Sequence, residues 1–285
     1  MAIRLIAMDV DGTMIDTPDN MQIHPRVLRA VAEAVRRGIL VCIASGRNFA
    51  YAEDYLKRSG VNGPLISCNG ASVLSAGRVY FKKTLDPAMV EFSYRFSREY
   101  GMNPMAFTDH EIYFPTYGSA EADQRFIDAY TCDGTGAQAF HPISDEEYLA
   151  LAGRADELIK MSIITYDSEA HMRRALAAWE ALRAEGRIPG DPDCAVSFWC
   201  NFEVMPNGVS KGAGLMELVK VLGIDRSEVM AIGDNENDIE MIQVAGIGVA
   251  MGNAVERLKA AADHVTLSVK EGGAGVAIEK FALLD

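Results

Sequence analysis

Short apolar runs alternate with amphipathic stretches at the start of the chain. The almost wholly apolar runs are residues 3–8, 39–44 and 64–67. Between them, residues 27–35 and a stretch ending near residue 59 carry apolar side chains at helical spacing. Continuous apolar strands that alternate with helices predict a parallel sheet with helices on its faces. A small hairpin of residues 72–74 and 79–81 is expected next.

From about Thr84 the pattern changes to a mixture of short strands and helices. Helices are expected over residues 87–100 and 168–184, and helical and loop material between residues 115 and 155. The expected strands are residues 105–108, 111–114, 157–165, 195–199 and 202–205. This mixture is typical of an α+β module with a partly antiparallel sheet.

The first pattern returns near the end of the chain. Strands are expected at residues 229–232, 247–250 and 264–266, and helices at 210–222, 238–244 and 254–261. The simplest architecture is one doubly wound, Rossmann-like α/β core made from both ends of the chain. That core takes residues 1–83 and 206–285, and an α+β domain of residues 84–205 is inserted into it.

Length and composition agree with this division. The chain has 285 residues, of which 49% are hydrophobic, so a large core plus a smaller module is expected. The sequence has no run of about 18 apolar residues and no signal-peptide pattern, which predicts a cytoplasmic protein without a membrane span. Five cysteines lack metal-site spacing and are expected to be reduced thiols: Cys42, Cys68, Cys132, Cys194 and Cys200. Cys42 and Cys68 lie in apolar surroundings, which favours packing roles.

The formal net charge of −13 narrows the class of partner. Nucleic acids and anionic membranes need a cationic surface, so neither is expected as a partner. A small anionic substrate would need a site where the potential is locally inverted. In solution, a monomer or a weak homodimer is expected.

Polar residues follow the predicted core strands, at the sheet edge where parallel α/β folds bind ligands. They are Asp9-Val10-Asp11-Gly12-Thr13, Ser45-Gly46-Arg47, Asn69-Gly70, and Gly233-Asp234-Asn235-Glu236-Asn237-Asp238. Asp9 and Asp11 share one face of an extended segment, so both carboxylates can address one ligand. Gly12 permits a sharp turn, and Thr13 can donate to an anion. Alone, this segment would be an ordinary turn as often as a site.

The second acidic cluster favours a ligand-binding site over an ordinary turn. Asp234 and Asp238 could serve as helix-capping or first-turn residues. Capping does not explain why four carboxylates collect at one edge, because two charges about 4 Å apart repel by roughly 4 kcal/mol at an effective dielectric constant of about 20. A hard divalent cation relieves this repulsion, and Mg²⁺ is the expected ion, with Asp9, Asp11, Asp234 and Asp238 as the acidic set. Such a cation also resolves the conflict between an acidic protein and an anionic substrate.

Four segments together resemble the motifs of the haloacid dehalogenase (HAD) superfamily. They are Asp9–Thr13, Ile43-Ala44-Ser45-Gly46-Arg47, Val209-Ser210-Lys211-Gly212 and Gly233–Asp238. Three further segments are similar to the Cof-type sugar-phosphatase branch: Asn69-Gly70-Ala71, Ala250-Met251-Gly252-Asn253-Ala254 and Lys270-Glu271-Gly272-Gly273-Ala274-Gly275-Val276. The resemblance covers both core segments, and residues 84–205 take the place of that branch's cap domain.

The resemblance implies a set of roles. Asp9 would be the nucleophile that forms an aspartyl-phosphate, and Asp11 the general acid and then the general base. Mg²⁺ would be held by Asp9, the backbone carbonyl of Asp11, and Asp234. The supports and phosphate-binding residues would be Thr13, Ser45, Gly46, Lys211, Asn237 and Asp238. Ser45 could also cap the following helix, and Arg47 and Asn69 are either substrate contacts or surface and turn residues.

The resemblance also implies that the cap selects the leaving group. Polar and aromatic candidates there are His110, Glu111, Tyr113, Tyr117, His141, Lys160 and Trp199, each of which has an ordinary structural reading as well. The expected activity is hydrolysis of small phosphate monoesters such as sugar phosphates. The alternatives are a phosphomutase acting on hexose phosphates and a non-catalytic regulatory protein that binds a phosphosugar.

Overall fold

A computed structural model describes residues 2–16, 21–75, 77–131, 134 and 136–284. The chain forms two compact units, a core unit of Met1–Phe81 with Ser210–Asp285 and a cap unit of Lys82–Val209. Within the described residues, no helix is both long and apolar enough to cross a bilayer.

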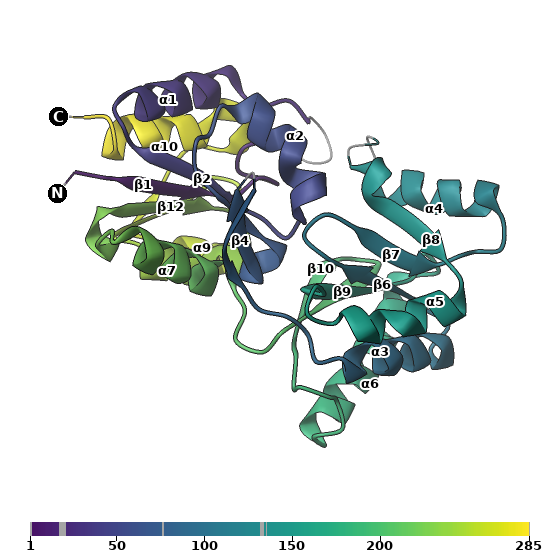
Figure 1. Ribbon diagram of the computed structural model, residues 1–285. Coiled ribbons are helices and arrows are strands. Elements are labelled where there is room, and N and C mark those ends of the chain that lie inside the picture. Colours follow the sequence, from purple (N-terminus) through teal and green to yellow (C-terminus); the bar gives the residue numbers. More distant parts are fainter. Residues whose placement is uncertain (1, 17–20, 76, 132–133, 135, 285) are drawn as a thin grey trace. The chain divides into compact units, whose positions relative to one another are not determined.

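The core unit is built on an eight-stranded sheet in the order β14-β13-β12-β1-β2-β3-β4-β5 (Figure 1). The strands are β1 (Leu5–Met8), β2 (Leu40–Ala44), β3 (Leu65–Ser67), β4 (Ser72–Ser75), β5 (Arg78–Lys82), β12 (Val229–Gly233), β13 (Ile247–Ala250) and β14 (His264–Val265). Neighbours from β14 to β3 run parallel, and β4 is antiparallel to β3. The two ends of the chain meet where β1 pairs with β12, so the predicted doubly wound fold class is confirmed.

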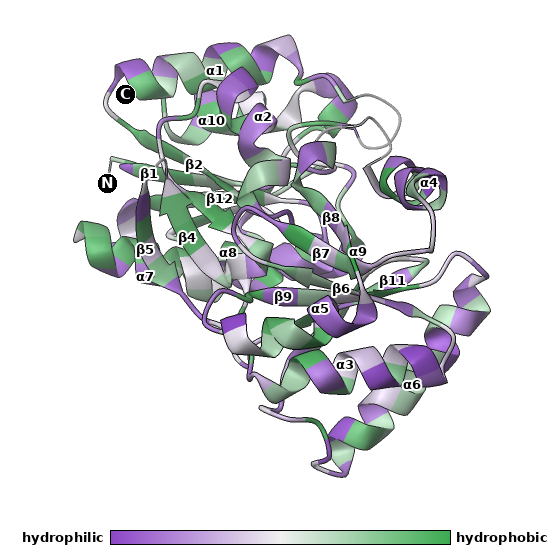
Figure 2. Cartoon of the chain, turned by 45° about the vertical axis from the view of Figure 1, so that its right-hand side comes forward, coloured by the Kyte–Doolittle hydropathy of each residue, from purple (hydrophilic) through white to green (hydrophobic). Residues whose placement is uncertain are grey.

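Helices cover both faces of this sheet. One face carries α1 (Pro25–Arg36), α2 (Phe49–Ser59) and α10 (Gly273–Phe281), and the other carries α7 (Lys211–Leu222), α8 (Ile239–Val244) and α9 (Glu256–Ala261). The central strands β1, β2 and β12 form a hydrophobic band, whereas polar and apolar residues alternate along α1 (Figure 2). In α1 the buried side chains Val27, Ala30, Val31 and Ala34 form an apolar stripe at helical spacing.

Helix α10 was not predicted from the sequence, and its first residues include Gly273 and Gly275. A Cβ on Gly273 would lie 1.9 Å from the carbonyl oxygen of Leu267, and one on Gly275 would lie 2.9 Å from the backbone of Arg26. The glycines therefore let α10 pack closely against its neighbours. Arg26 on α1 also donates from Nε to a carboxylate oxygen of Glu279 on α10 at 3.0 Å.

The cap unit contains a six-stranded sheet in the order β10-β11-β9-β6-β7-β8. The strands are β6 (Asn103–Phe107), β7 (Ile112–Pro115), β8 (Phe140–Ile143), β9 (Lys160–Ile164), β10 (Asp193–Phe198) and β11 (Asn201–Met205). All neighbours are antiparallel except β7 and β8. Strand β8 was missed because it contains Pro142, which a sheet accepts at its edge, where no partner needs the missing N–H.

The cap sheet has helices on both of its faces. The cap helices are α3 (Ala88–Glu99), α4 (Ala120–Thr131), α5 (Asp145–Ala150) and α6 (Glu169–Ala184). Phe96, Trp179 and Phe202 join α3, α6 and β11 in one aromatic cluster, with the rings of Phe96 and Trp179 edge to face at 5.1 Å. Phe126 of α4 packs against Phe114 in a second cluster. Each unit therefore has its own hydrophobic core.

Short 3₁₀ segments complete the described chain. They are η1 (Cys68–Gly70), η2 (Ala137–Ala139), η3 (Leu151–Arg154), η4 (Arg226–Glu228), η5 (Glu236–Asp238) and η6 (Val269–Glu271). Cys42 and Cys68 are buried, and no disulfide links the described cysteines. Cys132 lies outside the described residues.

Candidate active site

The loop after β1 is a tight turn that carries two of the predicted carboxylates. The N–H of Asp9 donates to the carbonyl of Ile232 at 3.0 Å, which extends the pairing of β1 with β12 by one residue. Gly12 has a φ of +82°, and a Cβ at this position would lie 2.2 Å from Oδ2 of Asp234. Only glycine therefore lets this turn approach the acidic loop that follows β12.

Two side chains tie the turn to its neighbours. Thr13 donates its hydroxyl to Oδ1 of Asp234 at 2.8 Å. Asn253 donates to the carbonyl of Gly12 at 2.8 Å and accepts the N–H of Val269 at the same distance. No role was predicted for Asn253, although it lies in one of the family-like segments. Its place directly after β13, at the same sheet edge, was the available signal.

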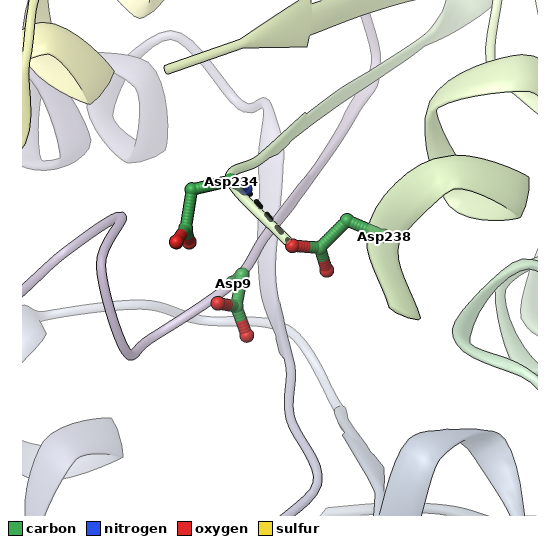
Figure 3. A group of neighbouring side chains, drawn as sticks. All are labelled: Asp9, Asp234 and Asp238. Carbon is green, nitrogen blue, oxygen red and sulfur yellow. Dashed lines mark hydrogen bonds between the residues drawn. The ribbon is translucent and has the colours of Figure 1, made fainter. Parts of the chain in front are cut away.

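Asp9, Asp234 and Asp238 converge on one point, as Figure 3 shows. One oxygen from each carboxylate can be chosen so that all three lie within 4.8 Å of one another. Burial raises the pKa of Asp9 well above its usual value; Lys211 opposes this rise, and the charges of Asp238 and Asp234 add to it. Burial also raises the pKa of Asp234 to about 6, with a further contribution from the charge of Asp238.

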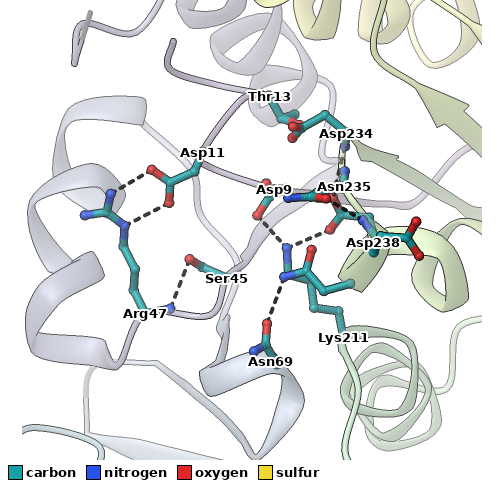
Figure 4. Close-up of polar contacts among 12 residues, drawn as sticks. Asp9, Asp11, Thr13, Ser45, Arg47, Asn69, Lys211, Asp234, Asn235 and Asp238 are labelled. Atoms are coloured by element: carbon teal, nitrogen blue, oxygen red, sulfur yellow. Dashed lines mark hydrogen bonds and ion pairs between the residues drawn. The ribbon is translucent and has the colours of Figure 1, made fainter. Parts of the chain in front are cut away.

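Lys211 lies in the middle of this acidic group. Its Nζ is 2.6 Å from Oδ1 of Asp9 and 2.6 Å from Oδ1 of Asp238, and the side chain is buried (Figure 4). Burial alone would lower the pKa of Lys211, but the two carboxylates outweigh it and raise the pKa. Ser210 is the N-cap residue of α7, accepting the N–H of Ala213 at 2.9 Å, so it fixes the start of the helix that carries the lysine.

Both oxygens of Asp238 are used by neighbouring groups. Oδ1 pairs with Lys211, and Oδ2 accepts the backbone N–H groups of Asp234 and Asn235 at 2.9 and 3.0 Å. Asp238 therefore shapes the acidic loop and holds the lysine. Beside it, Asn237 donates to Oδ1 of Asn69 at 3.0 Å.

The close approach of η1 to α7 depends on glycine. Gly70 has a φ of +96°, and a Cβ there would lie 2.0 Å from the carbonyl oxygen of Ser210. Asn69 has a φ of 54°, in the left-handed region that asparagine tolerates better than most residues. These two conformations bring Asn69 to the loop of Asn237.

The loop after β2 presents Ser45 and Arg47. Ser45 is buried, and its Oγ accepts the N–H of Arg47 at 3.2 Å. The proposed capping role of Ser45 is wrong: α2 begins at Phe49, and its N-cap residue is Asn48, whose side chain accepts the N–H of Tyr51 at 3.1 Å. The hydroxyl of Ser45 lies instead in the loop that precedes the helix.

Arg47 contacts Asp11 through two nitrogens. Nε lies 3.0 Å from Oδ2 and Nη2 lies 2.7 Å from Oδ1, and the guanidinium carbon is 4.2 Å from the ring centre of Tyr51 and 4.9 Å from that of Tyr55. No role for these two tyrosines was predicted from the sequence. Their spacing from Arg47, four and eight residues along a predicted helix, was the signal that could have found them.

The donor set fits a hard divalent cation. Carboxylate oxygens are the ligands that such ions prefer, and three carboxyl groups here face one ammonium group. Burial, with a further contribution from the neighbouring carboxylates, raises the pKa values of Asp9 and Asp234, which adds to the cost of this unbalanced negative charge. A bound cation would remove it.

The chain also matches known hydrolases along most of its length. The model of a family described as haloacid dehalogenase-like hydrolase matches residues 6–278. The chain belongs to the haloacid dehalogenase-like hydrolases. Within this family it is a Cof-type, subclass IIB phosphatase that acts on small phosphate esters, as the resemblance of its motifs implied.

Its relatives act on different compounds. A 5-amino-6-(5-phospho-D-ribitylamino)uracil phosphatase of Bacillus subtilis (strain 168) is 27% identical over 282 residues, which cover 94% of each chain. An HMP-PP phosphatase of Serratia proteamaculans (strain 568) is 29% identical over 260 residues, covering 90% of this chain and 86% of the relative. The solved subclass IIB sugar phosphatase BT4131 has a TM-score of 0.78 and 25% identity, covering 99% and 100% of the two chains. Membership of the family therefore identifies the reaction as phosphate ester hydrolysis but does not identify the substrate.

The cap candidates fall into separate groups. Nε2 of His141 contacts the carboxylate of Glu111, and the hydroxyl of Tyr113 lies 3.5 Å from the same carboxylate. Lys160 is buried in an ion pair with Glu203 at 2.7 Å, which gives it a structural role within the cap sheet. Nothing in these contacts identifies a leaving group. Tyr117 and Trp199 are exposed.

Asp234 gives a prediction about pH. Its pKa is about 6 in the folded protein against the usual 3.8, so near pH 5 the cation-free folded protein holds a proton there that the unfolded chain has lost. That proton stabilises the cation-free fold as the pH falls, and a cation must displace it. We expect a fixed concentration of MgCl₂ to raise the Tm less at about pH 5 than at about pH 7.5.

The matched variant for this measurement is Asp234→Asn, which removes the titrating group. In this variant the rise in Tm should be smaller at both pH values. An equal rise at both pH values in the wild-type protein would contradict the assignment of Asp234 to the cation site.

Proposed function

We propose that this phosphatase is Mg²⁺-dependent and that it hydrolyses small phosphate monoesters, such as sugar phosphates, through an aspartyl-phosphate on Asp9. The observation that carries the proposal is the contact of Asp9 with Lys211 at 2.6 Å, inside a cluster with Asp234 and Asp238. A buried carboxylate beside a fixed ammonium group and a cation site is suited to meet a phosphoryl group.

In the first step Asp9 attacks the phosphorus atom of the ester. A bond forms between a carboxylate oxygen of Asp9 and phosphorus, and the bond from phosphorus to the ester oxygen breaks. The electron pair of the broken bond stays on the leaving oxygen, which takes a proton from Asp11. The covalent intermediate divides one difficult displacement into two easier ones.

In the second step Asp11, now a carboxylate, takes a proton from a water molecule. The water oxygen bonds to phosphorus, and the bond between phosphorus and Asp9 breaks with its electron pair returning to the aspartate. Inorganic phosphate leaves, and Asp11 keeps the proton that it took from the water molecule, so both aspartates return to their starting forms. Asp11 therefore alternates between its acid and base forms.

The remaining residues bind, orient and balance charge. Asp9, the backbone carbonyl of Asp11 and Asp234 would hold Mg²⁺, which would neutralise charge on the phosphoryl oxygens. Asp238 supports this set rather than completing it, because its oxygens are occupied by Lys211 and two amides. The phosphoryl group would be bound by Thr13, Ser45, Gly46 and Lys211.

Three proposed substrate contacts have protein partners. Asn237 and Asn69 bond to each other, so they would act as one unit at the rim of the site. Arg47 is engaged with Asp11, which makes a direct role in binding the substrate secondary to that contact.

A panel of phosphate monoesters tests this function. The purified chain with MgCl₂ should release inorganic phosphate from at least one ester with a kcat/KM of about 10⁴ M⁻¹s⁻¹ or more, and a chelator should abolish the activity. Conversion of one hexose phosphate isomer into another without phosphate release would instead indicate a mutase. Thermal shifts with the esters but no turnover of any would indicate a binding protein.

A further inference from the structure

The guanidinium group of Arg47 holds the side chain of Asp11 through a two-pronged contact, called the fork below. Arg47 donates from Nε and Nη2 to the two carboxylate oxygens of Asp11, at 3.0 and 2.7 Å (Figure 4). A bidentate guanidinium fixes the plane of a carboxylate as well as its position. The Asp11 side chain is 38% exposed, and the two contacts with Arg47 restrict its rotamer.

Arg47 is itself held by an aromatic surface. Its side chain is only 10% exposed, and the rings of Tyr51 and Tyr55 lie within 5 Å of its guanidinium carbon. Both rings project from α2, whose first turn is fixed where Asn48 accepts the N–H of Tyr51. Because the guanidinium group lies against two aromatic rings that the helix holds in place, it has few alternative positions. The fork therefore offers Asp11 one orientation.

One nitrogen of Arg47 remains unused. Nη1 is buried and has no hydrogen-bond partner among the residues that the structure describes. Arginine residues that only stabilise a fold normally have their buried N–H groups satisfied. A buried donor beside the acid–base residue is instead available to an oxygen that enters the site, such as that of the attacking water molecule.

We infer that Arg47 is a positioning residue for the second step, the hydrolysis of the aspartyl-phosphate. This inference rests on the proposed function and deepens it. In that step Asp11 must be a carboxylate, which is the form that a fork of two N–H donors binds. Each carboxylate oxygen accepts more than one hydrogen bond, so lone pairs remain for the proton of the attacking water.

The test is Arg47→Met, assayed with an activated aryl phosphate whose leaving group needs little protonation. The kcat should fall by about tenfold to a hundredfold, because a misaligned base slows the hydrolysis of the intermediate. The kcat/KM should change by less than about threefold, because it reports the steps up to the transfer of phosphate to Asp9. A burst of the phenol, roughly equal to the enzyme concentration, should precede the slow steady state.

Tyr51 provides a second, milder pair of variants. Tyr51→Leu removes the aromatic face and should lower kcat in the same direction, with a burst, whereas Tyr51→Phe keeps the face and should lower kcat less than Tyr51→Leu does. This pair decides the matter if Arg47→Met does not fold. The control is Arg36→Met, which removes an exposed arginine paired with Glu33 on α1 and should leave both constants unchanged.

Two results would overturn the inference. Equal losses of kcat and kcat/KM without a burst would mean that Arg47 binds the substrate or only supports the fold, and unchanged kinetics would mean that it does neither. The inference and the proposed function fail differently. A wild-type enzyme that turns over without any covalent phosphoenzyme contradicts the proposed function. A phosphoenzyme that turns over at the same rate in wild type and Arg47→Met contradicts only the role of Arg47.

Discussion

Replacing Asp9 by asparagine is expected to lower kcat by at least about a thousandfold for every phosphate ester that the chain hydrolyses. The amide has nearly the size of the carboxyl group but cannot form the covalent intermediate. The folded structure should survive, because one of three converging carboxylates becomes neutral while Lys211 keeps its pair with Asp238. Initial rates at saturating ester and MgCl₂, together with a thermal melt, measure both effects.

The matched control for this variant is Asp54→Asn. Asp54 forms an exposed i,i+4 ion pair with Arg58 on α2, outside the acidic cluster, so its replacement should leave kcat unchanged. Substantial activity in Asp9→Asn, with Asp54→Asn equally active, would rule out Asp9 as the nucleophile.

Replacing Lys211 by methionine is expected to produce the largest loss of stability. The free energy of unfolding of the cation-free protein at neutral pH should fall by roughly 3–5 kcal/mol, since Asp9 and Asp238 then both lose the buried ammonium group that lies 2.6 Å from each of them. The loss should shrink as the pH falls, because protonation of a carboxyl group removes one of the two charges. Denaturant unfolding at two pH values measures this change.

A lysine on the same helix supplies the control. Lys220 lies in the last turn of α7 and its side chain is 78% exposed, so Lys220→Met should change the free energy of unfolding by less than about 0.5 kcal/mol. If Lys211→Met were equally harmless, Lys211 would not be neutralising buried charge. Added MgCl₂ should restore part of the lost stability, because the cation faces the same carboxylates.

The sheet edge that carries the candidate active site could be predicted from the sequence, because the carboxyl ends of parallel strands lie at the same edge of a sheet. Once β1, β2, β3 and β12 were assigned from their apolar runs, the residues that follow them had to meet at one edge. That rule brings Asp9 and Asp234 together across more than 200 positions of the chain. The rule predicts which loops lie close together, but it does not predict which of their side chains contact one another.

Helix α10, strand β8 and the contact between Arg47 and Asp11 were not predicted, because each depends on tertiary packing. Helix α10 contains glycines that usually disfavour helices, and their small size is what allows the close approach to Leu267 and Arg26. Strand β8 contains a proline that only its edge position permits. The contact between Arg47 and Asp11 depends on the rotamer of a long side chain, which no periodicity encodes. The leaving group depends on the cap unit, where polar residues such as Lys160 have protein partners of their own.

We expect Asp9 to carry the phosphoryl group during turnover. The most direct measurement is to quench the enzyme with acid during steady-state hydrolysis, reduce it with borohydride and locate the product by peptide mass spectrometry. Reduction converts an aspartyl-phosphate into homoserine. If Asp9 is the nucleophile, homoserine should be found at position 9 only in the sample that received substrate. Unmodified Asp9 in an enzyme quenched during rapid turnover, or homoserine at another position, would contradict it.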